Sequence, residues 1–239
     1  MSVHLVGGGW PESGDARPYS EFFAEAAACA RAAGRALPRI AIISVRDGDE
    51  SAHAAKLVDA LALAGPVTPV VSAVPHGGVV PSTALAEIDG VVVGGGLVPA
   101  YRDALEPRFG ELRRLVADGT PYLGFSAGAM IAAERAIIGG RAIGGVQVSP
   151  EQGDQGLDEV TVAPGIGLVD VAIDVHLAQW GALSRLVAAV EAGVADGGLG
   201  IDEETVLIVG EGGLRAVGRG NVWRVLPDER GVRVGTVRA

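Results

Sequence analysis

Ser126 has the clearest sequence context for covalent chemistry in this chain. It lies in the stretch PYLGFSAGAM (121–130) and forms a Gly124-x-Ser126-x-Gly128 pattern between an expected buried strand and an expected helix. A sharp strand-to-helix turn lifts such a serine above the sheet edge, and glycines let the strand and helix approach closely. The N–H of Ala127 would then face a developing oxyanion. The alternative is a Gly/Ala-rich turn that only packs tightly, and the flanking pattern favours the nucleophile.

A serine nucleophile needs a general base, and the chain has four histidines. His4 lies inside the first expected strand, His53 lies on a helix whose pattern places it on an exposed face, and His76 lies in a Gly/Pro loop. His176 directly follows an expected strand at 171–175, whose end should share the rim of the sheet with the serine. His176 is therefore the favoured base, and a strand-end histidine bonded to a backbone carbonyl is the alternative.

The group that orients the base is less visible. Asp202, Glu203 and Glu204 stand together at the start of a strand, and strand neighbours point to opposite faces. One of them could enter the site, while a solvated acidic turn is the more common outcome. The glycines at 94–96 follow another strand, and their unobstructed N–H groups could supply a second oxyanion donor.

The elements that must position these groups alternate between strand and helix. Strands that read as unbroken apolar runs, joined by helices, predict a mostly parallel, doubly wound sheet covered on both faces, in a three-layer α/β/α arrangement of flavodoxin-like type. The alternating tail predicts an antiparallel meander that completes the same sheet. We expect one domain over 1–239. The expected strands are 3–6, 39–45, 67–71, 89–93, one at Tyr122, 160–162, 171–175 and 205–209; the expected helices are 19–34, 51–64, 99–118 with a kink at Pro107, one opening at 131–134, and 179–192; the meander is 214–217, 222–226 and 232–237.

Composition excludes several classes of function. The net charge of −10 and the scattered basic residues argue against a nucleic-acid or membrane partner. A single cysteine, Cys29, excludes an internal disulfide framework. We expect no cofactor and no metal, because the run Gly7-Gly8-Gly9 is not a dinucleotide fingerprint and no ligand cluster has metal spacing. The start of the chain lacks a secretory pattern, so a cytoplasmic location is expected, with a homodimer as the default assembly.

Four stretches together resemble the peptidase E / cyanophycinase family of serine peptidases. They are VVVGGGL (91–97), GFSAGAM (124–130), GIGLVDVAIDVHLAQWGALSRL (165–186) and GLGIDEETVLIV (198–209). The resemblance implies a class I glutamine amidotransferase-like fold, with serine in place of cysteine at the elbow. It also implies a nucleophile at Ser126, a base at His176 and an orienting acid at Glu203. The implied oxyanion donors are the N–H groups of Gly95, Gly96 and Ala127.

The chain departs from the family pattern where the substrate is held. Leu97 stands where a polar residue usually follows the loop glycines, Val175 replaces the glutamine before the histidine, and Leu177 replaces the phenylalanine after it. Two family arginines become Trp180 and Ala182. The positions that remain as substrate contacts by this resemblance are Leu97, Asp174, Trp180 and Arg185.

The lost polar groups argue against cyanophycin and weaken the case for aspartyl dipeptides. A buried carboxylate ligand without a cationic partner is costly. We therefore expect a less acidic peptide or amide substrate, unless Arg102 or Arg135 reaches the site.

Three functions remain open. The first is a serine peptidase or amidase acting on small peptides through Ser126, His176 and Glu203. The second is a non-catalytic member of the same fold that binds a small ligand or partner, which the altered substrate positions favour. The third is an esterase with the same triad, consistent with Leu97 and Trp180.

Overall fold

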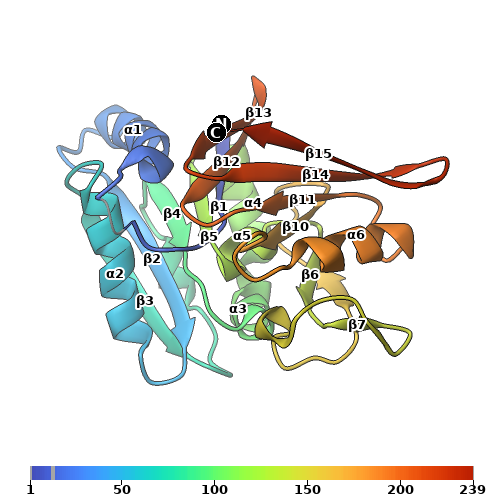
Figure 1. The fold of residues 1–239 in the computed structure, drawn as a ribbon. Helices are drawn as coiled ribbons and strands as arrows, with labels where there is room; N and C mark the ends of the chain where they lie inside the picture. Colours follow the sequence, from blue (N-terminus) through green and yellow to red (C-terminus); the bar gives the residue numbers. More distant parts are fainter. Residues whose placement is uncertain (1, 12–13, 239) are drawn as a thin grey trace.

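The computed structural model describes residues 2–11 and 14–238. Its core is a seven-stranded sheet in the order β13-β12-β1-β5-β4-β2-β3 (Figure 1). The five strands from β1 to β3 in that order are parallel, β12 pairs antiparallel with β1, and β13 pairs antiparallel with β12. The predicted mostly parallel sheet with antiparallel C-terminal strands is confirmed. The strands are β1 (Ser2–Val6), β2 (Arg39–Arg46), β3 (Thr68–Pro75), β4 (Gly90–Val93), β5 (Tyr122–Phe125), β12 (Thr205–Gly210) and β13 (Gly213–Gly218).

Strand β2 shows why the sheet is covered on both faces. Ile40 and Ile42 pack with the helices α1 and α2, whereas Ala41 and Ile43 pack with the layer on the opposite face. All four side chains are fully buried, as an unbroken β-branched run predicts. Helices α1 (Arg17–Ala32) and α2 (Glu50–Ala62) lie side by side at the left of Figure 1.

The opposite face is covered by a helix that breaks at Pro107. The predicted helix 99–118 is α3 (Val98–Leu105), a 3₁₀ turn (Glu106–Arg108) and α4 (Phe109–Ala117). Proline lacks the N–H that would continue the helix, so the break follows from the sequence. A further 3₁₀ turn, Ser82–Leu85, precedes β4.

A second sheet corrects the prediction of one continuous sheet. Its order is β10-β11-β14-β15, with β10 and β11 parallel and the rest antiparallel. Only β13 of the predicted meander joins the main sheet. The strands are β10 (Ala172–Val175), β11 (Gly198–Ile201), β14 (Asn221–Asp228) and β15 (Gly231–Arg238), and α6 (Leu183–Glu191) packs against them.

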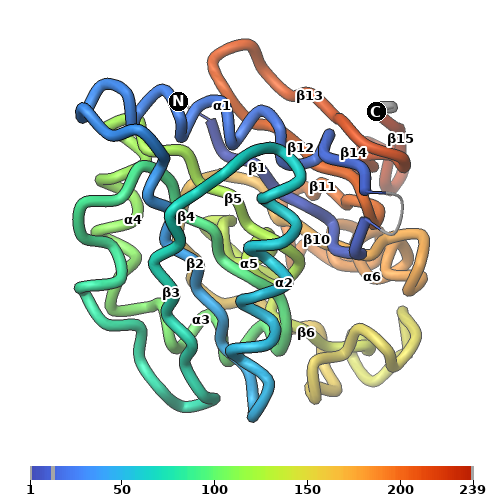
Figure 2. Tube along the Cα trace, turned by 90° about the vertical axis from the view of Figure 1, so that its left-hand side faces the viewer, coloured from blue at the N-terminus to red at the C-terminus, as the bar shows by residue number. Residues whose placement is uncertain are grey.

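The segment after the strand-to-helix turn at Ser126 also differs from expectation. Helix α5 (Ala127–Met130) is a single turn, and the chain then enters β6 (Arg135–Gly139) instead of continuing as a helix at 131–134. An excursion follows, which lies below α6 in both views (Figures 1 and 2). It contains β7 (Ala142–Ile143), β8 (Val146–Gln147) and a 3₁₀ turn (Glu151–Gly153), and β9 (Thr161–Pro164) returns to pair with β6. Within the described ranges, no helix is long and apolar enough to cross a membrane.

Candidate active site

Ser126 sits in the strained turn between β5 and α5. Its backbone has φ 53° and ψ −108°, a conformation that non-glycine residues rarely adopt. The turn is anchored because the Ser126 N–H donates to the carbonyl of Val6 at 2.9 Å. Gly124 and Gly128 cross so closely that a Cβ on Gly124 would lie 2.4 Å from the carbonyl oxygen of Gly128. The glycines of the pattern are therefore required by the close approach of strand and helix.

His176 lies within hydrogen-bond distance of Ser126, with 2.8 Å between Nε2 and the serine Oγ. The histidine follows β10 with φ 53°, and its backbone N–H donates to the carbonyl of Gly7 at 3.0 Å. Because β10 belongs to the second sheet, the two residues do not share the rim of one sheet, contrary to expectation. The loop after β1 instead ties the end of β10 to the main sheet.

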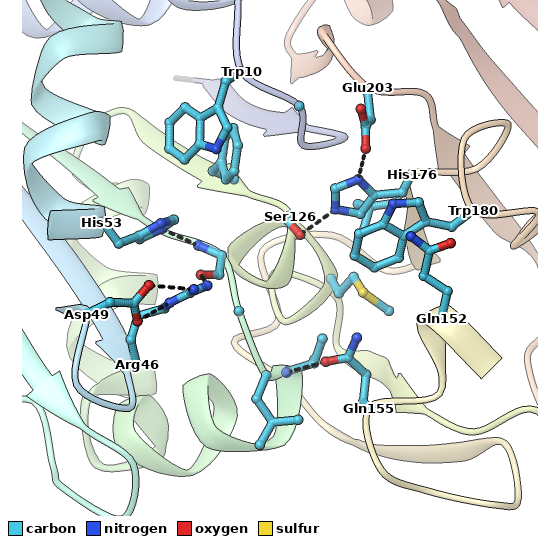
Figure 3. A pocket seen from close by; sticks show the side chains of 18 of the residues that line it. Trp10, Arg46, Asp49, His53, Ser126, Gln152, Gln155, His176, Trp180 and Glu203 are labelled. Atoms are coloured by element: carbon cyan, nitrogen blue, oxygen red, sulfur yellow. Dashed lines mark hydrogen bonds and ion pairs between the residues drawn. The ribbon is translucent and has the colours of Figure 1, made fainter.

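Glu203 accepts a hydrogen bond from His176, with 2.6 Å between Nδ1 and Oε1 (Figure 3). The neighbouring acids point elsewhere. Asp202 accepts from the backbone N–H of Ala178 and from the indole Nε1 of Trp223, at 3.1 and 2.9 Å. Glu204 pairs with Arg219. The three adjacent acids thus have three different partners, and only Glu203 reaches the histidine.

These contacts set the protonation of the His176 ring. A carboxylate at Nδ1 keeps the proton on that nitrogen and leaves Nε2 free to accept from the serine hydroxyl. Burial lowers the pKa of His176 below its ordinary value, and the hydrogen bond that the ring donates to Glu203 opposes that shift. The neutral ring, which is the form able to accept a proton, is therefore favoured near neutral pH.

The glycines after β1 lie directly against His176, Asp202 and Glu203. A Cβ on Gly8 would lie 2.0 Å from Cε1 of His176, and a Cβ on Gly7 would lie 2.1 Å from the carbonyl oxygen of Asp202. Gly8 also has φ +96°. The run Gly7-Gly8-Gly9 lets the backbone of the first loop pack against the histidine.

The predicted oxyanion donors are not equivalent. Within residues 2–11 and 14–238, the N–H groups of Gly96 and Ala127 donate no hydrogen bond to the protein. The N–H of Gly95, in contrast, donates to Nε2 of His53 at 3.1 Å. The expectation that the Gly95 N–H is free to donate to an oxyanion is therefore not supported. The N–H groups of Gly96 and Ala127 remain available for that role.

The burial of His53 also differs from the expectation. His53 is only 7% exposed, although its helix pattern had suggested an exposed position. Its ring packs edge-on against Trp10 and Phe125. Burial, reinforced by Arg46, lowers its pKa to about 4, so the ring is neutral and can accept the Gly95 N–H. His53 lies four residues before Leu57 of the buried stripe, and that spacing was the signal for burial.

A cavity of about 1030 Å³ opens over Ser126. Trp10 and His53 lie on one side of the serine in Figure 3, and His176 and Trp180 lie on the other. Leu97, Val98 and Met130 add apolar lining. The polar loop between β8 and β9 forms a wall, through Gln152, Asp154, Gln155 and Gly156. Gln155 is fixed there because its side-chain oxygen accepts from the Val98 N–H at 3.0 Å.

The two arginines that line the cavity are already paired. Arg46 makes two hydrogen bonds to Asp49, at 2.9 and 2.8 Å. Arg185 makes two to Asp174, at 2.9 and 2.7 Å, and also donates to the carbonyls of Gly140 and Gly153. Asp174 is fully buried and does not line the cavity, so its expected role as a substrate contact is not supported.

The remaining cations differ in position. Lys56 lines the cavity and lies 5.9 Å from the centre of the Trp10 ring. Arg102 instead pairs with Asp103 and Glu106, and Arg135 pairs with Asp196. Neither Arg102 nor Arg135 reaches the cavity.

Backbone strain is concentrated at this cavity. Of the five non-glycine residues with positive φ in the described chain, Ser126, Gln155, His176 and Glu204 line it, and only Glu87 lies elsewhere. Such strain is maintained where the surrounding structure fixes a functional geometry. No cluster of three metal-ligating side chains gathers in the part of the chain that the structure describes.

The chain is similar to several known proteins. Residues 79–217, more than half of the chain, match the family model of peptidase family S51. The cyanophycinase of Synechococcus elongatus is 36% identical over 126 residues, which cover 52% of this chain and 36% of that protein. The cyanophycinase of Trichormus variabilis is 35% identical over 121 residues, which cover 49% of this chain and 38% of that protein.

The chain thus spans little more than a third of the length of these curated relatives. A solved peptidase from an acI-B1 Actinobacterium aligns over 100% of this chain and 96% of its own, with a TM-score of 0.58 and 14% identity. That likeness concerns the fold alone, and it agrees with the expected class I glutamine amidotransferase-like arrangement.

Proposed function

Because the chain belongs to peptidase family S51, we propose that it is a serine peptidase that hydrolyses small peptides through an acyl-enzyme on Ser126. The observation that carries the proposal is the continuous hydrogen-bonded path from Ser126 through His176 to Glu203, at 2.8 and 2.6 Å. Two adjacent hydrogen bonds of this kind allow the base to take the serine proton while the acid holds the ring.

The proposed reaction proceeds in two steps. Ser126 Oγ attacks the substrate carbonyl as His176 Nε2 accepts its proton, and the N–H groups of Gly96 and Ala127 stabilise the negative charge on the carbonyl oxygen. His176 then donates the proton to the leaving amine. In the second step His176 activates a water molecule, which hydrolyses the ester and restores the serine.

The substrate that this cavity favours is a peptide without an acidic side chain next to the scissile bond. Arg46 and Arg185 are already neutralised by Asp49 and Asp174, so neither is free to bind a carboxylate. The walls offer the indole faces of Trp10 and Trp180 and neutral amides from the loop that carries Gln155. Aromatic or uncharged polar side chains match these surfaces better than aspartate does.

The test is hydrolysis of a dipeptide and tripeptide library followed by mass spectrometry, with wild type beside Ser126→Ala. Cleavage confined to the wild type supports the proposal and ranks the preferred residues. Equal results for the two proteins across the library would reject a peptidase and leave the esterase and the non-catalytic binding role.

Ester hydrolysis is the second candidate, favoured by the apolar wall at Leu97, which is 36% exposed, and at Trp180. It uses the same nucleophile and differs in its leaving group. Short acyl esters should then be cleaved faster by wild type than by Ser126→Ala while the peptide library is left intact. Equal rates for esters in the two proteins would remove this candidate.

A further inference from the structure

Gly95, in the loop beside Ser126, is held by three side chains. The N–H of Gly95 donates to Nε2 of His53 at 3.1 Å. The carbonyl of Gly95 accepts from Nη1 of Arg46 at 3.1 Å and from the hydroxyl of Tyr101 at 3.2 Å. Loop backbone in a cavity wall is usually satisfied by water or by other backbone groups. Here both polar groups of one glycine are bonded to side chains of β2, α2 and α3.

This segment passes directly beside Ser126. A Cβ placed on Gly95 would lie 2.8 Å from the Cβ of Ser126. In a trans peptide the carbonyl of one residue and the N–H of the next point in opposite directions. Fixing the Gly95 carbonyl toward Arg46 and Tyr101 therefore fixes the Gly96 N–H in the opposite direction.

Each of the three side chains is itself held in place. Arg46 is fixed by its two hydrogen bonds to Asp49. Tyr101 is fully buried. His53 packs edge-on against two uncharged rings, Trp10 of the first loop and Phe125 of β5, which stack on each other. Because His53 accepts from Gly95 at Nε2, its own proton lies on Nδ1. The charged groups that act on its titration are Arg46, Asp49 and Lys56.

We propose that His53, Arg46 and Tyr101 are positioning residues, which hold Gly95 so that the Gly96 N–H is preorganised for an oxyanion. Arg46 and Tyr101 fix the Gly95–Gly96 peptide, which carries that N–H, and His53 fixes the peptide before it. The proposal rests on the proposed serine chemistry at Ser126. In this proposal, three side chains outside the triad orient a backbone N–H donor. Preorganised donors act on the transition state, because charge develops on the substrate oxygen only there.

The probe is an alkyl fluorophosphonate carrying a fluorophore, so the test requires no knowledge of the natural substrate. Ser126 Oγ forms a bond to phosphorus, the phosphorus–fluorine bond breaks and fluoride leaves, and His176 takes the hydroxyl proton. The phosphoryl oxygen occupies the place of the substrate carbonyl oxygen. The maximal labelling rate and the half-saturating probe concentration are measured separately.

His53→Leu removes the acceptor for Gly95, and we expect its maximal labelling rate to fall about 10- to 100-fold, less than direct loss of an oxyanion donor. His53→Gln restores an acceptor oxygen and should recover most of the rate. Tyr101→Phe and Arg46→Gln each remove one of two donors to the carbonyl and should lower the rate about 3- to 10-fold. The half-saturating concentration should change little in all of them.

Tyr19→Phe is the matched control for Tyr101→Phe, because Tyr19 is also buried but packs in the layer of α1. It should label at the wild-type rate. Thermal midpoints of all variants show whether each is folded, and Tyr101→Phe keeps the buried ring if His53→Leu does not fold.

The outcomes separate the two claims. A wild type that is not labelled at Ser126 would overturn the proposed serine chemistry and the positioning role with it. A labelled wild type, with folded His53→Leu, Tyr101→Phe and Arg46→Gln variants that react at its rate, would overturn the positioning role alone. Slower labelling that is not rescued by His53→Gln would also count against it.

Discussion

The indole of Trp180 lies face to face with the imidazole of His176, with ring centres 3.8 Å apart and planes inclined by 4°. Together with the hydrogen bond to Glu203, this stacking restricts rotation of the histidine ring. Trp180 therefore restrains the His176 ring as well as lining the cavity.

Replacing Trp180 should impair catalysis through this contact. We expect Trp180→Leu to lower kcat about 10-fold, because a loosened histidine spends less time aligned with Ser126. Trp180→Phe keeps a flat ring and should retain most of the activity. Steady-state kinetics on the best library peptide provide the measurement, and a change confined to KM would show that Trp180 only contacts the substrate.

Gly8 should not tolerate a side chain. Gly8→Ala would place a methyl group against the His176 ring at a residue with φ +96°, so we expect activity to fall at least about 100-fold. Gly213→Ala is the control, since Gly213 has φ +90° but no neighbour within 4 Å of the added atom. It tests backbone strain without the contact. Equal activity of the two variants would contradict the proposed packing.

The pH profile follows from the state of His176. Burial lowers its pKa from the ordinary value of 6.5, with Glu203 acting in the opposite direction. Only the neutral ring accepts the serine proton, so kcat/KM should fall as pH drops through the pKa of the folded protein, at a midpoint below 6.5. In Glu203→Gln the midpoint should move to still lower pH. A wild-type midpoint above 6.5 would contradict this assignment.

The buried pair Asp174–Arg185 should be important for stability. The two side chains are 0% and 3% exposed, and Arg185 also ties down the loop that contains Gly153. Asp174→Asn leaves a buried guanidinium without its counter-charge and should lower the free energy of unfolding by about 3–5 kcal/mol.

The exposed pair Arg135–Asp196 provides the comparison in denaturant titrations. Its side chains are 58% and 91% exposed, so Arg135→Ala should change the unfolding free energy by about 1 kcal/mol or less. Similar losses for Asp174→Asn and Arg135→Ala would show that the buried pair is not a main stabilising contact.

Local sequence signals located much of this arrangement. The buried run around Ile42 and the Gly-x-Ser-x-Gly pattern at Ser126 depend on neighbours in the chain, so the central strands and the strained turn could be predicted. An apolar run such as Ala172–Val175 looks the same in either sheet, however, and its assignment depends on tertiary pairing. The prediction of one continuous sheet was therefore wrong, although His176 still lies within hydrogen-bond distance of Ser126.

The contacts around Gly95 could not be predicted from local sequence patterns. His53, Arg46 and Tyr101 come from separate elements and meet only in the folded chain. The helical periodicity of α2 did indicate that His53 is buried, because His53 shares a face with the buried Leu57. Which partner a buried histidine would find could not be read from spacing.

The coupling between Ser126 and His176 is the relationship on which the proposed function depends. It is tested most directly by a double-mutant cycle, with kcat measured on the best-cleaved library peptide for Ser126→Ala, His176→Ala and both together. Residues that act as one unit are not additive, so each single variant should lose about 10³-fold or more and the double variant should lose no more than either. Multiplicative losses, or a folded single variant that keeps wild-type kcat, would contradict a serine activated by this histidine.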